Sequence, residues 1–332
     1  MSKRGLIVTS VVLVFVLCVF ILLYFGYFLM SPAGFNRAEE TFIVERGSGL
    51  RAVANQLQQS TLIKSKDLFV VWALLKGGSR SIKAGEYGLN RSMTPVQIYA
   101  ILTSGAVKTH PLTIPEGLAV QAIADLFAAN GLVDNEEFIS LAMDKGFAAS
   151  HHIDGPSTEG YLFPDTYVLS KGMGARQILD LMINRFWQVF NSLVQDRELP
   201  MSIRDIVILA SIVEKETGLA EERPVIASVF LNRLNRRMRL ESDPTVIYDL
   251  KDFDGNLTKK HLQAPSPYNT YRHLGLPPGP IANPGRASLE AVLNPAQTSY
   301  LYFVSKNDGS HFFSSTLKEH NRAVVRYQKR RR

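Results

Sequence analysis

The chain has 332 residues, 46% of them hydrophobic and 20% charged, with one cysteine; this composition excludes disordered, fibrous and disulfide-stapled proteins and suffices for two compact domains. The formal net charge is +7, but six basic residues lie at the chain ends, and the body keeps 31 basic and 30 acidic residues. Because the body is nearly neutral, a nucleic-acid-binding surface has no electrostatic support, and we expect no nucleic-acid partner.

Residues 5–30 form the first predicted element, a membrane-spanning helix. They carry no charge and are rich in Leu, Val and Phe. A helix of 26 residues is about 39 Å long at about 1.5 Å per residue, which exceeds the roughly 30 Å hydrocarbon core of a bilayer. Tyr24 and Tyr27 fall near one interface, where aromatic amphiphiles settle. We therefore expect a single-pass protein of the cytoplasmic (inner) membrane.

The charges before this helix predict its orientation. Lys3 and Arg4 have no opposing acid, so residues 1–4 are expected to form a cytoplasmic tail and the remainder to be periplasmic or otherwise extracytoplasmic. The alternative is a cleaved signal peptide, with Ser31-Pro32-Ala33 as a small-residue cleavage site. The apolar run is longer than the roughly 7–15 residues of a signal sequence, which favours the membrane span.

The sequence carries no recognisable metal or cofactor site. Cys18, the one cysteine, lies within the predicted span, so the rest of the chain has no thiol for disulfides, nucleophilic catalysis or zinc. The seven histidines show no metal-ligand spacing, and no phosphate-binding or serine-nucleophile motif occurs. We therefore expect neither metal nor cofactor.

After a short tether at 31–38, residues 39–107 are predicted to form a small module. Apolar spacing indicates a strand at 41–44, helices at 50–57 and 66–75, a strand at 84–89 and a helix at 95–102. The order strand, helix, helix, strand resembles a LysM-like module, a small fold that binds chains of N-acetylated sugars. The alternative is a spacer without ligand.

Residues 108–325 are predicted to form a larger mixed domain, which makes the overall fold class α+β. It should open with a strand within 109–117 and contain an irregular aromatic-rich segment at 159–167. Residues 326–332 form a basic tail that we interpret as solvated rather than lipid-bound. Periodicity predicts helices at 119–130, 136–145, 175–193, 203–218 and 221–236, closing strands at 300–304 and 311–313, and a last helix after residue 321.

The helix predicted at 203–218 is apolar on all sides, which is typical of a buried helix. It ends in Glu214 and Glu216, which face nearly opposite ways because two residues correspond to about 200° of rotation. Glu216 lies over the more apolar neighbours, so burial and the helix C-terminus should raise its pKa and keep it protonated as a general acid. Either glutamate could instead pair with Lys215 or an arginine. Gly218 is expected to cap the helix in the left-handed conformation.

Loops dense in Tyr, Asn, Thr and Pro follow this helix. Hydroxyl and amide groups hydrogen-bond sugar hydroxyls and acetamides, and tyrosine rings stack on pyranose rings. The alternative is that each loop only satisfies its own backbone. The candidate substrate-binding residues in these loops are Asp243, Thr245, Tyr248, Tyr268, Asn269 and Tyr271.

Taken together, these motifs resemble the YceG-like family of endolytic murein transglycosylases. The resemblance covers nearly the whole chain, including the N-terminal span and the LysM-like module. Its motifs are IPEG at 114–117, GYLFPDTY at 160–167, ASIVEKET at 210–217, FLNRL at 230–234, SDPTV at 242–246, YNTY at 268–271 and GLPPGPI at 275–281. In that family the second glutamate of the EKE triplet is the catalytic acid, which implies Glu216 here.

The resemblance implies non-hydrolytic cleavage of the β-1,4 bond between N-acetylmuramic acid and N-acetylglucosamine within a glycan strand, giving 1,6-anhydromuramoyl ends. Glu216 would act first as acid and then as base. The substrate's own acetamide could stabilise the positive charge that develops at C1, and Asp243 is a second candidate for this role. The implied partners are glycan strands, the membrane and peptidoglycan synthases near which strands are terminated. The rival hypotheses are a hydrolytic muramidase and a non-catalytic cell-wall-binding tether.

Overall fold

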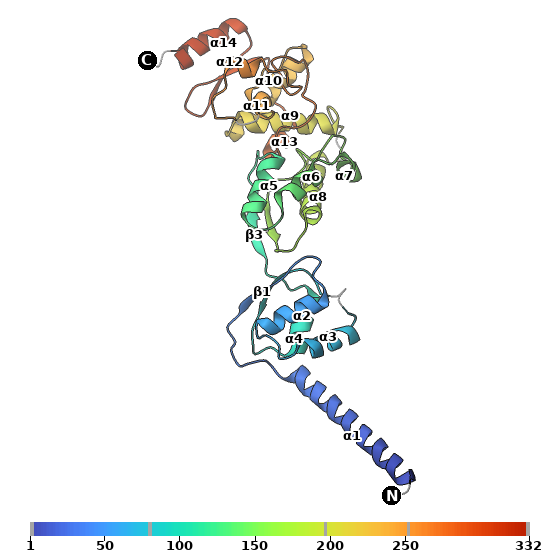
Figure 1. Cartoon of the computed structure of the whole chain (residues 1–332). Coiled ribbons are helices and arrows are strands. Elements are labelled where there is room, and N and C mark those ends of the chain that lie inside the picture. Colours follow the sequence, from blue (N-terminus) through green and yellow to red (C-terminus); the bar gives the residue numbers. More distant parts are fainter. Residues whose placement is uncertain (1–2, 79–81, 196–197, 251–252, 330–332) are drawn as a thin grey trace. The chain divides into compact units, whose positions relative to one another are not determined.

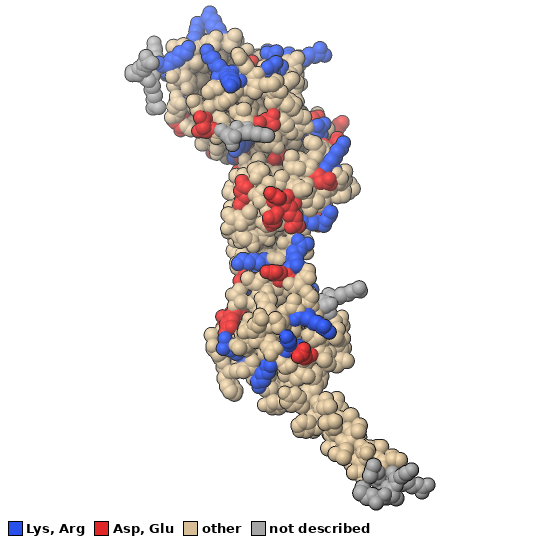
Figure 2. Space-filling model, viewed as in Figure 1, with Lys and Arg blue, Asp and Glu red and all other residues tan. Residues whose placement is uncertain are grey.

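The computed structural model describes residues 3–78, 82–195, 198–250 and 253–329, and it has a mixed α/β architecture (Figure 1). The chain divides into two compact units. Unit 1 consists of Met1–His110 and Val168–Met173, and unit 2 consists of Pro111–Tyr167 and Gly174–Arg332. Figure 2 shows charged side chains of both signs spread over the visible face of both units.

The N-terminal apolar helix is confirmed as α1 (Lys3–Met30). Its Ile7–Met30 part is, among the described residues, the one helix long and apolar enough to cross a membrane, and most of its side chains are exposed. Phe28 and Leu29 are exceptions, because they are buried in the hydrophobic core of unit 1. The last turn of α1 is therefore part of the folded unit.

Unit 1 contains the strands and helices that apolar spacing predicts. The two strands pair antiparallel, with Phe42 opposite Tyr87, and both of these side chains are buried. The first helix buries Leu50, Val53 and Leu57 on one face, as its periodicity indicates. The elements are β1 (Glu40–Val44), α2 (Leu50–Gln59), α3 (Lys66–Leu75), β2 (Gly85–Leu89) and α4 (Pro95–Ser104).

The segment predicted as a tether is bonded to unit 1. The Lys64 ammonium donates to Ser31 Oγ at 2.7 Å, and Gly34 N donates to the carbonyl of Arg91 at 2.8 Å. A later segment also belongs to this unit, since Lys171 forms an ion pair with Glu86 at 3.3 Å. Unit 1 is thus assembled from parts of the chain distant in sequence.

The strands β3 (His110–Thr113) and β4 (Thr166–Leu169) form a two-stranded sheet. The unit boundary falls inside both strands. Residues 159–165 have no regular structure, as their aromatic-rich, proline-broken sequence predicts, but the end of that segment enters β4.

Unit 2 is mainly helical, and α9 (Ile203–Glu216) forms its centre. Every residue from Ile206 to Val213 is buried, which confirms the predicted buried helix, and α9 packs against α10, α11 and α13. The other elements are α5 (Val120–Ala129), α6 (Asn135–Ala142), α7 (Lys145–Ser150), α8 (Ala175–Val194), η2 (Ala220–Glu222), α10 (Arg223–Asn235), α11 (Asp243–Ile247), α12 (Lys259–Leu262), α13 (Arg286–Leu293), β5 (Tyr302–Ser305), β6 (His311–Ser314), α14 (Leu317–Val324) and η3 (Val325–Lys329).

The predicted end of α9 is wrong. The helix stops at Glu216, Thr217 is extended, and Gly218 is not left-handed. The Thr217 hydroxyl accepts a hydrogen bond from Leu219 N at 3.0 Å and directs the chain into η2. A side-chain turn thus replaces the glycine cap.

Several boundaries after α9 also differ from prediction. The segment predicted as one helix from residue 221 begins with η2, and α11 forms where a loop was expected. The helices α12 and α13 lie in segments for which no element was predicted. The strands β5 and β6 do pair, antiparallel, as predicted. The last helix starts at Leu317, earlier than predicted. Of the basic tail, residues 326–329 belong to η3, and 330–332 lie outside the described residues.

Candidate active site

Glu216 lies at the C-terminal end of α9 and faces a cavity of about 360 Å³. Its side chain is half-buried, and the Ser242 hydroxyl donates a hydrogen bond to its Oε1. We call this space the catalytic cavity because it contains the residue that the sequence analysis predicts to be the catalytic acid. It is lined by Glu216, Arg233, Leu240, Glu241, Asp243, Tyr271, Phe303 and His320. No ion pair to Glu216 occurs within the part of the chain that the structure describes.

The Ser242 hydroxyl is held in place by a buried network of threonines. Ser242 N donates to Thr270 Oγ1 at 3.0 Å, and Thr245 Oγ1 donates to the Ser242 carbonyl at 2.7 Å. The two threonine hydroxyls are 2.8 Å apart. The preceding residue, Glu241, has a φ of 49°, a left-handed conformation that is uncommon outside glycine. The backbone at Ser242 is therefore set by contacts within unit 2.

Burial raises the pKa of Glu216 to about 7. The Ser242 hydrogen bond and the Arg233 charge lower it, whereas the Asp243 charge raises it. A carboxyl with a pKa near 7 holds a proton in about half of the molecules at neutral pH. Such a group can donate a proton and take one back at the same pH.

Glu214 has a different environment. Its side chain is 5% exposed, and its Oε1 is 3.4 Å from Nη2 of Arg223. Its Oε2 accepts a hydrogen bond from Gly285 N at 2.9 Å. The structural alternative that the sequence left open, pairing with an arginine, thus applies to Glu214 and not to Glu216.

Two of the predicted substrate-binding residues, Asp243 and Tyr271, line the catalytic cavity. The Tyr271 hydroxyl donates to Asp243 Oδ1 at 2.6 Å. Burial, followed by that hydrogen bond, raises the pKa of Tyr271 above its usual value, so the phenol stays protonated. The structure therefore brings a second carboxylate and a tyrosine next to Glu216.

Thr245 and Asn269 do not line the catalytic cavity. Both are fully buried. Asn269 Nδ2 donates to the carbonyls of Leu262 and Ala264, and its Oδ1 accepts from Tyr271 N at 3.0 Å. The two buried side chains therefore stabilise the loops that carry Ser242 and Tyr271.

Tyr248 lies elsewhere, at a second cavity of about 950 Å³. Its ring centroid is 4.9 Å from that of Tyr268, and its hydroxyl donates to Glu159 Oε2 at 3.1 Å. This second cavity is lined by 117–122, Ile139, Met143, Glu159, Lys215, Pro244, 247–250 and Ile281. Of the six predicted substrate-binding residues, two therefore line the catalytic cavity and Tyr248 lines the second cavity, whereas Thr245, Tyr268 and Asn269 line neither.

Glu159, which sequence reasoning missed, connects several loops of unit 2. It is 3% exposed and accepts hydrogen bonds from Val120 N, Asn283 Nδ2 and the Tyr248 hydroxyl. Burial raises its pKa to about 7. Gly160 follows with a φ of 87°, and a Cβ there would lie 2.5 Å from Cγ of Pro280. This close approach explains the glycine of the GYLFPDTY motif.

Arg233 and His320 were also missed, although both line the catalytic cavity. Arg233 is 7% exposed; its Nε donates to the Leu301 carbonyl at 2.6 Å and its Nη1 to the Leu240 carbonyl at 2.8 Å. The His320 ring stacks on Tyr302 with centroids 5.3 Å apart. An arginine close to the apolar residues Phe230, Leu231 and Leu234 of FLNRL was the available signal for Arg233.

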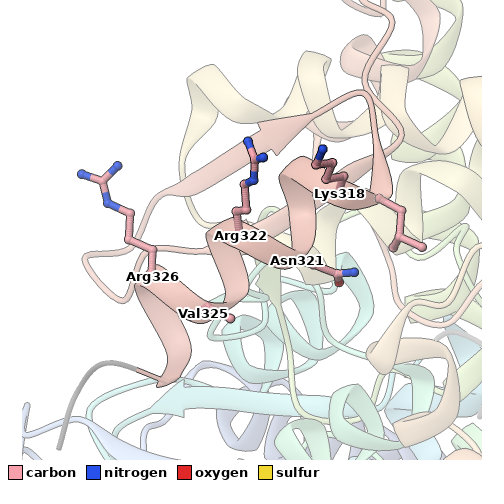
Figure 3. Close-up of a pocket in the computed structure, with 6 residues that line it drawn as sticks. Lys318, Asn321, Arg322, Val325 and Arg326 are labelled. Atoms are coloured by element: carbon pink, nitrogen blue, oxygen red, sulfur yellow. The ribbon is translucent and has the colours of Figure 1, made fainter.

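Among the described residues, no three His, Cys, Asp or Glu side chains are grouped as metal ligands. A third, shallow hollow of about 720 Å³ lies on the last helix, where Lys318, Arg322 and Arg326 project (Figure 3). Its lining contains no carboxylate.

The sequence model described as the YceG-like family matches residues 42–326. The chain belongs to the YceG-like family. It is 35% identical over 303 residues to an endolytic murein transglycosylase of Bacillus subtilis (strain 168), with 86% of this chain and 83% of that protein covered. It is 28% identical over 346 residues to an endolytic murein transglycosylase of Streptococcus pneumoniae (strain R6), with 92% of this chain and 62% of that protein covered.

A crystal structure of a YceG-like protein from Listeria monocytogenes has the same fold. The two chains are 33% identical with a TM-score of 0.58, and the match covers 87% of this chain and 100% of that chain. The family predicted from the motifs is confirmed.

Proposed function

We propose that the protein is a membrane-anchored endolytic murein lytic transglycosylase, with Glu216 as its catalytic acid and base. The relatives named endolytic murein transglycosylases support the activity. The observation that carries the residue assignment is the environment of Glu216, a half-buried carboxyl with a pKa near 7 that faces a cavity beside a fixed serine hydroxyl. The substrate is the glycan strand of peptidoglycan.

The reaction needs one proton donor that becomes an acceptor. Protonated Glu216 gives its proton to the glycosidic oxygen as the bond from that oxygen to C1 of N-acetylmuramic acid breaks. The resulting glutamate then takes the proton from the C6 hydroxyl while that oxygen forms a bond to C1. The products are a 1,6-anhydromuramoyl end and a new N-acetylglucosamine hydroxyl, and Glu216 is again protonated.

Positive charge develops at C1 between these two steps. Asp243 lines the same cavity and is held by the Tyr271 hydroxyl. A fixed carboxylate stabilises such charge without reorganising during the reaction. We assign this role to Asp243 and the role of orienting it to Tyr271.

The remaining assignments concern the cell. We propose that residues 39–107 form a LysM-like module that binds glycan and that 108–325 form the transglycosylase domain. We also propose that the N-terminus is cytoplasmic and the enzyme extracytoplasmic, since Lys3 and Arg4 precede the apolar helix. Anchoring there favours action on nascent strands near peptidoglycan synthases.

The test is digestion of purified cell wall by the full chain and by Glu216→Gln, with products identified by mass spectrometry. We expect anhydromuramoyl ends from the wild type and at least a thousandfold slower release from Glu216→Gln. Unchanged release by the variant would overturn the assignment of Glu216, and no release by either chain would leave only the wall-binding tether. Heavy oxygen from labelled water at the new reducing ends would identify a hydrolytic muramidase instead.

A further inference from the structure

Lys215, the central residue of the EKE triplet, has no role in the proposed reaction. Glu214 pairs with Arg223 and Glu216 faces the catalytic cavity, whereas Lys215 lines the second cavity. Its ammonium donates to the Gly117 carbonyl at 3.1 Å. Within the described residues it has no carboxylate at ion-pair distance. A lysine without an acid partner can therefore receive an anion from outside the chain.

The position of this ammonium is set by the loop beneath it. Gly117 has a φ of 76°, and a Cβ there would lie 3.6 Å from Cδ of Lys215, so the lysine stem runs close over the glycine. The carbonyl that accepts from the ammonium belongs to the same glycine. Since both the aliphatic stem and the ammonium of Lys215 contact the turn at Gly117, the positive charge is held at the edge of the second cavity.

The walls of the second cavity are mainly apolar. Asp249 adds one exposed carboxylate to the lining, and Glu159 is already bonded to three donors of unit 2. A volume of about 950 Å³ is within the range of ligand-binding cavities. The larger apolar side chains of the lining are Leu118, Val120, Ile139, Met143, Ile247, Leu250 and Ile281.

An apolar hollow with one cation and one anion at its edge suits a short peptide of small side chains that carries both a carboxylate and an amine. Murein carries such peptides on its muramic acid residues. Lys215 and Glu216 are consecutive residues of α9, so their Cα atoms are about 3.8 Å apart and their side chains diverge by about 100°. A branched substrate can therefore place its glycan arm in one cavity and its peptide arm in the other.

We propose that the second cavity binds the peptide stem of the muramic acid residue at the cleavage site, with Lys215 pairing with a stem carboxylate. This inference rests on the proposed function and assigns a substrate specificity to it. The enzyme then prefers strands that still carry their stems over strands from which an amidase has removed them.

The test compares kcat/KM of the full chain on stem-bearing and on amidase-treated glycan strands. We expect the wild type to prefer stem-bearing strands about tenfold or more, and Lys215→Met to lose most of that preference. Lys215→Arg should keep it, because the positive charge remains. The matched control is Lys318→Met on α14, which also lines a hollow but lies outside both cavities (Figure 3).

A second measurement needs no turnover. A synthetic stem tetrapeptide of alanine, glutamate, lysine and alanine is titrated calorimetrically into full-length Glu216→Gln. We expect binding that is lost in the double variants with Lys215→Met and with Ala122→Trp, whose indole would fill the cavity. Equal preference of wild type and Lys215→Met, or undiminished peptide binding by both double variants, would overturn the inference. Retained cleavage by Glu216→Gln alone would instead overturn the proposed function.

Discussion

Two glutamates two residues apart on one helix have different roles because the helix turns them to different surroundings. Glu214 is enclosed with Arg223 and the backbone of Gly285, so it is a structural ion pair. Glu216 meets a hydroxyl and a cavity. Its helical phase over apolar neighbours was readable from the sequence, but the serine that contacts it comes from residue 242 and could not be located by spacing.

The Ser242 hydrogen bond should be visible in the pH profile. Cleavage requires protonated Glu216, so the rate should fall as pH rises above about 7. Ser242 favours the ionised form, and Ser242→Ala should therefore move this alkaline limb to higher pH. Loss of orientation should also lower kcat about tenfold. The measurement is kcat as a function of pH, and the control is Ser140→Ala, because Ser140 is exposed. An alkaline limb that stays at the same pH in Ser242→Ala would refute the role of Ser242.

The same carboxyl links stability to pH. Its folded pKa of about 7 exceeds the ordinary 4.5, so the folded protein binds more protons than the unfolded chain between these values. The stability due to the protonated group is present at low pH and is lost as pH rises through 7. Glutamine cannot ionise, and Glu216→Gln should gain about 1–2 kcal/mol relative to wild type between pH 5 and pH 8. Urea unfolding at both pH values measures this gain, and a pH-independent difference would contradict it.

At the scale of elements, α9 depends on neighbours that fix its C-terminal end. The Glu214–Arg223 pair joins it to α10, and Gly285 N joins it to the start of α13. The sequence predicted α9 from its apolar residues, yet it placed the end two residues too late. The short α11 was missed because Asp-Pro-Thr reads equally well as a turn, and its helical form depends on bonds to Thr270 in a distant loop.

Breaking the Glu214–Arg223 pair should cost stability rather than chemistry. In Arg223→Met, a carboxylate with a 5% exposed side chain loses its cation, which should lower the free energy of unfolding by about 2–4 kcal/mol. Arg185→Met is the matched control, because its pair with Asp165 is 36–40% exposed and should cost less than about 1 kcal/mol. Thermal unfolding measures both variants, and kcat of the folded fraction should change little. Equal losses in the two variants would contradict the assignment.

At the scale of the whole molecule, local sequence patterns were sufficient to predict an element when its buried face is formed by one continuous segment. The helices α2 and α9 are of this kind, and α1 was predicted from its length and apolar composition alone. The catalytic cavity is not, because its walls come from positions 216, 233, 240, 241, 243, 271, 303 and 320, which meet only after folding. The segment after α1 looks like a free linker by its proline and glycine, but it is bonded through Ser31 and Gly34.

The burial of Phe28 and Leu29 predicts that a chain shortened to remove the membrane helix is sensitive to its first residue. A chain that starts at Tyr27 keeps both side chains in the unit 1 core, whereas one that starts at Ser31 removes them. The shorter chain should lose about 3 kcal/mol or more from unit 1, as large core truncations do. With Trp187→Phe in both chains, Trp72 emission during urea unfolding reports unit 1 alone. Coincident unfolding curves would show that these side chains add nothing.

Because the end of α1 is part of a folded core, the proposed membrane anchor is not connected to unit 1 by a flexible linker. If α1 lies in a bilayer, rotation of α1 about its own axis would also rotate the rest of unit 1. The hydrogen bonds of Ser31 and Gly34 leave no flexible segment between α1 and the rest of that unit. The distance between unit 1 and the lipid headgroups would then be nearly constant. With α1 in the membrane and unit 1 on its outer side, as proposed, unit 1 would reach only glycan close to the lipid surface and not polymer far out in the wall.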